Sequence, residues 1–204
     1  MSVTDNNATY LFQKHNKSEQ WWTSIFTLVL AHVGGTSDVS RLPVWVFRRM
    51  EKKWRYERLP EFFSFHGVKL SDIHVEAAIP DVFTELKRFG PFHVQPDIII
   101  RRDAEKTATI IENKTQGTGV NRLDDYIQAR DELQRMGYNA TTYLLISVGN
   151  NTRDDIWKVA LQHEIPLLLW EDVLRLIDGI DWLRDLFDED LKPYYCNPPL
   201  SSLD

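Results

Sequence analysis

Hydrophobic and polar positions repeat with two different periods along the chain, and the period predicts the element. Residues 18–33 are apolar on nearly every side and are followed by two glycines, which predicts a buried helix. Isoleucine-rich residues 96–100 and 107–114 flank a short charged turn, which predicts a β-hairpin. Residues 72–79 alternate enough to predict a strand, although a short helix fits them too.

The second half of the chain alternates between helical and strand spacing. A helix is predicted from Asn121, a strand at 141–148, a further helix from Thr152 and a short apolar strand at 165–170. This alternation after a hairpin predicts an α/β fold with a mixed β-sheet flanked by helices. Because a chain of 204 residues can bury its apolar surface in one core, we expect a single domain over residues 1–204.

A basic and aromatic segment interrupts this pattern. From Pro43 to about Tyr56 the spacing predicts a helix, within an insertion at about 43–60, and residues 60–70 read as irregular. Residues 48–58 carry six basic and two acidic side chains among aromatic ones, a local charge of +4. Such a segment suits phosphate binding and base stacking, although a solvated helix with its aromatic side chains in the core has the same pattern. The candidate nucleic-acid contacts are Arg48, Arg49, Lys52, Lys53 and Arg55.

The net charge of −6 does not exclude a polyanionic ligand, because the negative charge is local. Residues 171–190 hold eight acidic and two basic side chains, and their apolar spacing predicts an acidic C-terminal helix. The single cysteine excludes an intrachain disulfide. The sequence has no secretory signal and no apolar run long enough for a bilayer, so we expect a cytoplasmic protein without a membrane partner.

The predicted hairpin places two carboxylates opposite each other. If the turn is centred at 104–105, opposed residue numbers sum to 209, so that Asp97 faces Glu112. Like charges in this position repel, and a divalent cation reverses the sign of the interaction. Lys114 follows two residues after Glu112 and therefore points to the same face of the sheet. The backbone carbonyl of Asn113 is a further candidate metal ligand.

These residue types suit phosphodiester hydrolysis. Asp97 and Glu112 would hold Mg²⁺ or Mn²⁺, which acidifies a water molecule and clamps phosphate oxygens. Lys114 would orient the water and neutralise the charge that develops on the phosphate. The chain has no P-loop lysine motif, no GxGxxG and no HExxH, which argues against ATP-driven or NAD-dependent chemistry.

The sequence Pro96-Asp97, followed fifteen positions after the aspartate by Glu112-Asn113-Lys114, resembles the signature of the PD-(D/E)XK nucleases, the restriction-endonuclease-like superfamily. The resemblance covers about residues 72–170, with the helix at 18–33 as the preceding core element. It implies a restriction-endonuclease-like core, which is a four-stranded mixed sheet flanked by helices. It also implies that the aspartate, glutamate and lysine have the roles given above.

The same resemblance implies additional site residues. Many members of the superfamily contribute a glutamate from the first core helix, which is Glu19 if that helix is 18–33 and Glu76 if residues 72–88 form it; Glu19 is the preferred candidate. Several members place a Gln, Tyr or Arg on the helix after the lysine strand. Gln128 and Arg130 are candidates for this contact with nucleic acid, whereas Tyr126 fits the core.

The expected function is therefore that of a divalent-metal-dependent nuclease. We expect an Mg²⁺- or Mn²⁺-dependent endonuclease, a phosphodiester hydrolase that acts on nucleic acid, with DNA favoured over RNA, in restriction, defence or repair. A homodimer would cut both strands of a duplex, and the sequence leaves the oligomeric state open. The alternative is a non-catalytic nucleic-acid-binding or scaffolding module of a larger complex with the same fold.

Overall fold

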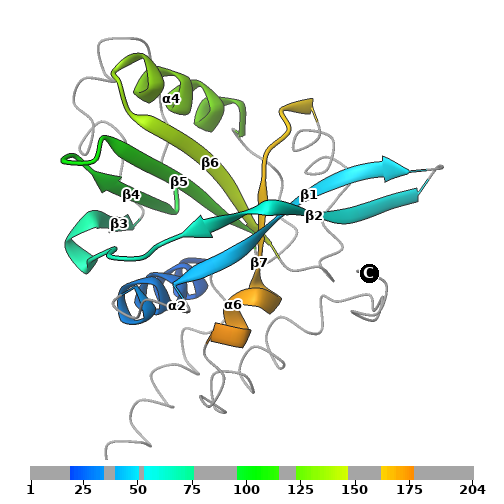
Figure 1. Ribbon diagram of the computed structural model, residues 1–204, viewed down its shortest axis with the longest axis horizontal. Helices are drawn as coiled ribbons and strands as arrows, with labels where there is room; N and C mark the ends of the chain where they lie inside the picture. The colour runs from blue at the N-terminus through cyan, green and yellow to red at the C-terminus, as the bar shows by residue number, and fades with distance from the viewer. Residues whose placement is uncertain are drawn as a thin grey trace, which may run out of the picture.

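The described strands form one seven-stranded mixed sheet (Figure 1). The computed structural model describes residues 19–34, 40–50, 53–75, 96–114, 123–146 and 162–176. The strands are β1 (Arg41–Met50), β2 (Lys53–Ser64), β3 (Ile73–Val75), β4 (Ile98–Arg102), β5 (Thr107–Lys114), β6 (Asn139–Ile146) and β7 (Leu167–Leu169). The helices are α2 (Glu19–Val33), α4 (Leu123–Arg135) and α6 (Trp170–Leu176), with the short 3₁₀ helix η1 (Leu70–Asp72). The predicted α/β class with a mixed sheet is confirmed.

The strand order across the sheet is β2-β1-β7-β6-β5-β4-β3. Strands β5, β6 and β7 run parallel at the centre of the sheet. Antiparallel strands complete it on both sides, with β1 and β2 beyond β7 and with β4 and β3 beyond β5. The carboxyl ends of the three parallel strands therefore meet at one end of the sheet.

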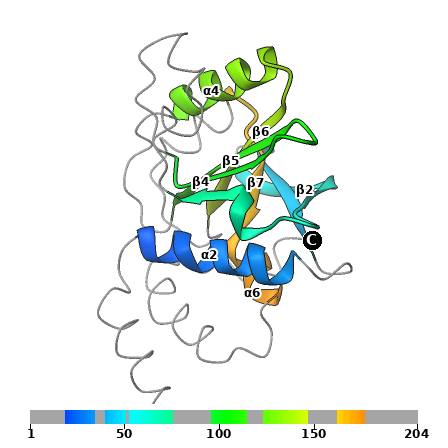
Figure 2. The ribbon, with the colours of Figure 1, turned by 90° about the vertical axis from the view of Figure 1, so that its left-hand side faces the viewer.

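The sheet has a core on each face. Helices α2 and α6 cover one face and α4 covers the other, as Figure 2 shows with the sheet between them. On the α2 side, the ring of Trp170 makes edge contacts with Trp22 and Phe26 at centroid distances of 5.4 and 5.8 Å. Along β5, Ile110 is buried on the α4 side and Ile111 on the α2 side, which is the alternation expected of a central strand.

The β4–β5 hairpin confirms the predicted register. Ile99 pairs with Ile110 and Arg102 with Thr107, so that paired residue numbers sum to 209. The turn at 103–106 is exposed. The strand predicted at 72–79 is confirmed for β3, whereas Asp72 ends the 3₁₀ helix η1 and residues 76–79 lie outside the described residues.

The helix predicted from Pro43 to Tyr56 is wrong, because this segment forms most of the antiparallel β1–β2 ribbon. Its aromatic residues pair across the strands, with the Phe47 and Tyr56 ring centroids 5.2 Å apart, and both pack on the α4-side core. Burial of this face outweighs the helix propensity of the lysines and arginines. The irregular chain predicted at 60–70 is wrong as far as Ser64, the end of β2. Strand β2 lies at an edge of the described sheet, where a proline such as Pro60 is tolerated.

The remaining predictions hold for the parts that are described. Strands β6 and β7 confirm the strands expected at 141–148 and 165–170, and α4 confirms the helix expected after Asn121. The acidic segment at 171–190 is helical in α6 as far as Leu176, and its remainder lies outside the described residues, as does the helix expected from Thr152. Among the described residues, no helix is long and apolar enough to cross a membrane.

Candidate active site

The end of the β4–β5 hairpin brings Asp97 to Glu112. The regular pairs run as far as Ile98 and Ile111, and Asp97 immediately precedes β4. Its side chain is fixed there because the backbone N–H of Asn113 donates a hydrogen bond of 2.6 Å to Asp97 Oδ2. The Glu112 carboxylate lies close enough to Asp97 for its negative charge to raise the pKa of Asp97. The expected opposition of the two acids is therefore present.

Glu112 and Lys114 lie on the same face of β5. Ile111 packs in the α2-side core and the Asn113 side chain bonds to α2, so the intervening side chains point to the α4 side. Lys114 Nζ lies 2.5 Å from Glu112 Oε1. Both side chains are buried, with 4% of Glu112 and 8% of Lys114 exposed. An ammonium and two carboxylates thus share a small, largely dehydrated space at the carboxyl end of the strand.

The titration of Asp97 reflects this crowding. Burial and the neighbouring carboxylate of Glu112 raise the pKa of Asp97 to about 7. The Asn113 N–H and the Lys114 ammonium act in the opposite direction and favour the ionised form. Among the described residues one lysine faces these two acids, so that ionisation of Asp97 places a second negative charge beside Glu112, which is costly. This is the electrostatic condition for a carboxylate pair that binds metal.

The Asn113 side chain anchors the strand on the opposite face. Its Nδ2 atom donates to Thr23 Oγ1 of α2 at 3.0 Å, and its Oδ1 accepts a 3.0 Å hydrogen bond from Trp170 Nε1 of α6. Sequence reasoning assigned Asn113 only a carbonyl role toward metal, which stays a prediction, and it missed this anchor. The available signal was a polar side chain within an apolar strand, because a buried amide requires hydrogen-bond partners.

Comparison with known proteins finds no matching family model, curated protein or solved structure. Among the described residues, no group of three or more His, Cys, Asp or Glu side chains could hold a metal ion. Mg²⁺ keeps several water ligands and is commonly bound through one or two carboxylates, so that Asp97 and Glu112 fit it as a pair. Glu19 begins α2, but its side chain lies outside the described residues, and Glu76 lies outside them entirely.

The basic candidates of the β1–β2 ribbon lie apart from these carboxylates. Strand β1 is antiparallel to β7, with Trp45 opposite Leu167, so β1 ends and β2 begins at the end of the sheet opposite to the carboxyl ends of the parallel strands (Figure 1). Arg48 is exposed, and its Nε atom lies 2.6 Å from a Glu57 oxygen. The side chains of the other candidates lie outside the described residues: Arg49, Lys52, Lys53 and Arg55.

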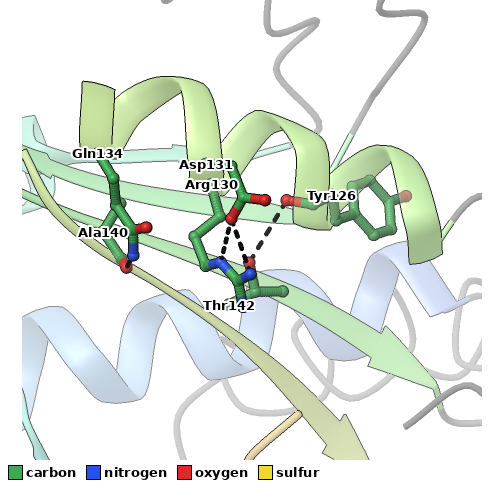
Figure 3. Close-up of polar contacts among 6 residues, drawn as sticks. All are labelled: Tyr126, Arg130, Asp131, Gln134, Ala140 and Thr142. Atoms are coloured by element: carbon green, nitrogen blue, oxygen red, sulfur yellow. Dashed lines mark hydrogen bonds and ion pairs between the residues drawn. The ribbon is translucent and has the colours of Figure 1, made fainter. Parts of the chain in front are cut away.

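Of the candidates on α4, Arg130 is partly buried and lies beside Asp131 (Figure 3). Arg130 donates two hydrogen bonds, of 2.9 and 2.7 Å, to Asp131 Oδ1. Gln128 is exposed between two buried neighbours and therefore points away from the sheet. Tyr126 is buried in the α4-side core, as predicted, and its carbonyl accepts a hydrogen bond from Thr142 Oγ1 at 3.5 Å. Contacts of Gln128 and Arg130 with nucleic acid stay predictions.

Proposed function

We propose that the protein is a divalent-metal-dependent nuclease with a restriction-endonuclease-like core, an Mg²⁺- or Mn²⁺-dependent phosphodiester hydrolase that acts on DNA. The observation that supports this most is the convergence of Asp97, Glu112 and Lys114 on one face at the end of the β4–β5 hairpin. Two acids held around one buried ammonium are unfavourable in a purely structural site and useful beside a metal ion and a phosphate.

Each side chain has a role that follows from its surroundings. A divalent ion held by Asp97 and Glu112 would supply positive charge to the phosphate and acidify a water molecule. Glu112 holds the Lys114 ammonium in place through the 2.5 Å ion pair. From this position Lys114 neutralises charge on a phosphate and orients the attacking water. The Asn113 N–H keeps the Asp97 carboxylate turned toward Glu112.

The test is divalent-dependent cleavage of plasmid, linear duplex and single-stranded DNA by the purified protein. We expect Asp97→Ala and Lys114→Ala each to lower the cleavage rate by about a hundredfold or more, because the first removes a metal ligand and the second removes the positive charge at the phosphate. The matched control is Lys106→Ala, which removes an exposed lysine from the turn at the other end of β5 and should leave the rate unchanged. Circular dichroism checks that each variant is folded. Full activity in both site variants would reject these roles.

A second candidate is a nucleic-acid-binding or scaffolding module without hydrolysis. The observation in its favour is the basic β1–β2 ribbon, in which β1 ends and β2 begins at the other end of the sheet from the carboxylates. Calorimetric titration with Mn²⁺ separates the two functions. Saturable binding that is lost in Asp97→Ala supports the nuclease, and the absence of binding supports the module.

A further inference from the structure

An exposed aromatic side chain lies between two arginines near the edge of the sheet. Phe62 of β2 is 40% exposed, and the guanidinium carbons of Arg41 and Arg58 lie 4.8 and 5.3 Å from the centre of its ring. Both arginines are exposed, and Arg58 also acts electrostatically on the buried carboxylate of Asp172, where its charge favours the ionised form. We call these three residues the Phe62 cluster. It combines a partly exposed apolar ring with two exposed guanidinium groups.

The Phe62 cluster lies on the same face of the sheet as the carboxylates. Phe63 is buried in the α2-side core, so Phe62, its neighbour in an extended strand, points to the α4 side. Glu112 and Lys114 also point to that side, as the ion pair between them and the opposite direction of Asn113 show. The cluster and the candidate active site therefore lie on the same face of the sheet.

The register also places the cluster level with Lys114. Lys114 is paired with Ile146, and Ile146 with Leu169. Trp45 opposite Leu167 brings Pro43 level with Leu169, and Pro43 is paired with Phe62. Phe62 and Lys114 thus occupy one row across the strands, at the end of the sheet where the parallel strands finish. Because Ile146 and Leu169 are buried, a ligand that joined the two would follow the rim of the sheet.

The spacing fits a short length of nucleic acid. The row crosses from β5 to β2 by way of β6, β7 and β1. Four steps of about 4.8 Å give a separation of about 19 Å. At about 3.4 Å for each nucleotide of one strand, this corresponds to about six nucleotides. A strand with its scissile phosphate beside Lys114 would reach the Phe62 cluster within that length.

We propose that the Phe62 cluster is a stacking platform for an unpaired segment of DNA that lies about six nucleotides from the scissile phosphate. Unpaired bases stack on aromatic rings and on guanidinium planes, so a base finds a stacking surface whether or not it displaces an arginine from the ring. The two arginines also bind the flanking phosphates through their positive charges. This inference rests on the proposed nuclease function and narrows its substrate to DNA that is single-stranded on one side of the cut.

The experiment is fluorescence anisotropy of the full-length protein in EDTA, with a labelled blunt duplex and the same duplex carrying a single-stranded tail of about eight nucleotides. We expect Phe62→Ala and Phe62→Leu to weaken binding of the tailed duplex by about tenfold, because base stacking is lost, and to leave the blunt duplex unchanged. Arg41→Gln and Arg58→Gln should each reduce the slope of log affinity against log salt by about 0.7 on the tailed duplex.

Two variants serve as matched controls. Leu70→Ala removes a side chain that is 60% exposed and lies outside the cluster, and Lys106→Gln removes one exposed positive charge from the β4–β5 turn. Both should bind the tailed duplex as the parent does. Unchanged affinity for the tailed duplex in both Phe62 variants, or an equal loss on the blunt duplex, overturns the platform.

The outcome also separates this inference from the proposed function. Tail binding that depends on Phe62, in a protein that neither binds Mn²⁺ nor cleaves DNA, keeps the platform and rejects the nuclease. Metal-dependent cleavage in which tailed and blunt substrates respond alike to Phe62→Ala rejects the platform and keeps the nuclease.

Discussion

Asp97 is the residue at which stability and the proposed chemistry conflict. Its carboxylate accepts the Asn113 N–H but lies beside Glu112, which is already paired with Lys114. Burial and the charge of Glu112 raise its pKa to about 7, well above the value of about 3.9 expected in an unfolded chain. A folded-state pKa above the unfolded one means that the folded protein binds this proton more tightly. The stability that the proton provides is complete below about pH 4 and is lost as the pH rises through about 7.

The first prediction at this scale concerns Asp97→Asn in EDTA. The amide oxygen still accepts the Asn113 N–H, and the negative charge beside Glu112 is gone. We expect the variant to be more stable than the parent by at least about 1 kcal/mol at pH 8, because each pKa unit corresponds to about 1.4 kcal/mol. The difference should shrink as the pH falls toward 5. Urea titrations at both pH values measure it, and a constant difference would contradict the raised pKa.

At the scale of elements, the alternating side chains of strand β5 have different roles on its two faces. One face carries the candidate site residues, and the other holds the strand to the helices. Glu112 and Lys114 point to the α4 side, whereas Asn113 between them bonds to Thr23 of α2 and Trp170 of α6. The position of the two site residues along the strand therefore depends on hydrogen bonds made on the other face. These bonds are buried, which makes their loss expensive.

Asn113→Ala tests this anchor. The change removes the hydrogen bonds of the Asn113 side chain to Thr23 and to Trp170, and the buried Trp170 N–H loses this acceptor. We therefore expect the unfolding free energy to fall by about 2 to 4 kcal/mol. The control is Asn139→Ala, at an exposed position of β6, which should change stability by less than about 0.5 kcal/mol. Chemical denaturation of both variants gives the comparison. Similar small effects in the two would show that the anchor contributes little.

The elements also show which parts of the fold could be predicted from the sequence alone. The β4–β5 hairpin was predictable with its register, because two β-branched runs and a short turn leave little choice of pairing. The same register located Asp97, Glu112 and Lys114 together. The β1–β2 ribbon was not predictable in this way, since its lysines and arginines favour a helix and the burial of Phe47 and Tyr56 decides for strands.

Contacts between residues far apart in the sequence account for the other features that the sequence did not predict. The Phe62 cluster depends on a register shift between β1 and β2 at 43–45, where Phe62 pairs with Pro43 and Arg58 pairs with Trp45, so that Arg58 lies closer to Phe62 along the ribbon than regular pairing would allow. Bulges of this kind re-aim side chains and leave no clear sign in a single sequence. The hydrogen bond from Trp170 to Asn113 joins positions 57 residues apart, which residue patterns cannot foresee.

At the scale of the whole molecule, a metal ion that binds only the folded state stabilises all of it. The pair Asp97 and Glu112 exists only when the β4–β5 hairpin and its neighbours are in place. If a divalent ion binds this pair, as we propose, its binding energy would add to the global unfolding free energy. Protons would compete with such an ion at Asp97, whose pKa is raised to about 7, so the gain in stability should be larger at alkaline pH.

We expect Mn²⁺ at a hundred times its dissociation constant to raise the unfolding free energy by about 2.7 kcal/mol relative to EDTA at pH 8. At pH 6 the same concentration should give a smaller gain, because Asp97 is then mostly protonated. Thermal melts with and without the metal measure both effects. The control is Asp97→Asn, in which the gain should be lost, and an equal gain in that variant would place the metal elsewhere.

The exposed β4–β5 turn is a suitable site for chemical labelling or immobilisation. Residues 103–106 protrude into solvent at the end of the hairpin away from Asp97 and Glu112. The chain contains a single cysteine, so replacing Cys196 with serine and Ala104 with cysteine would leave one thiol for a dye or a surface linker. Protein molecules attached to a support through this turn would keep Asp97 and Glu112 on the side away from the support. Individual binding events could then be observed on the immobilised protein.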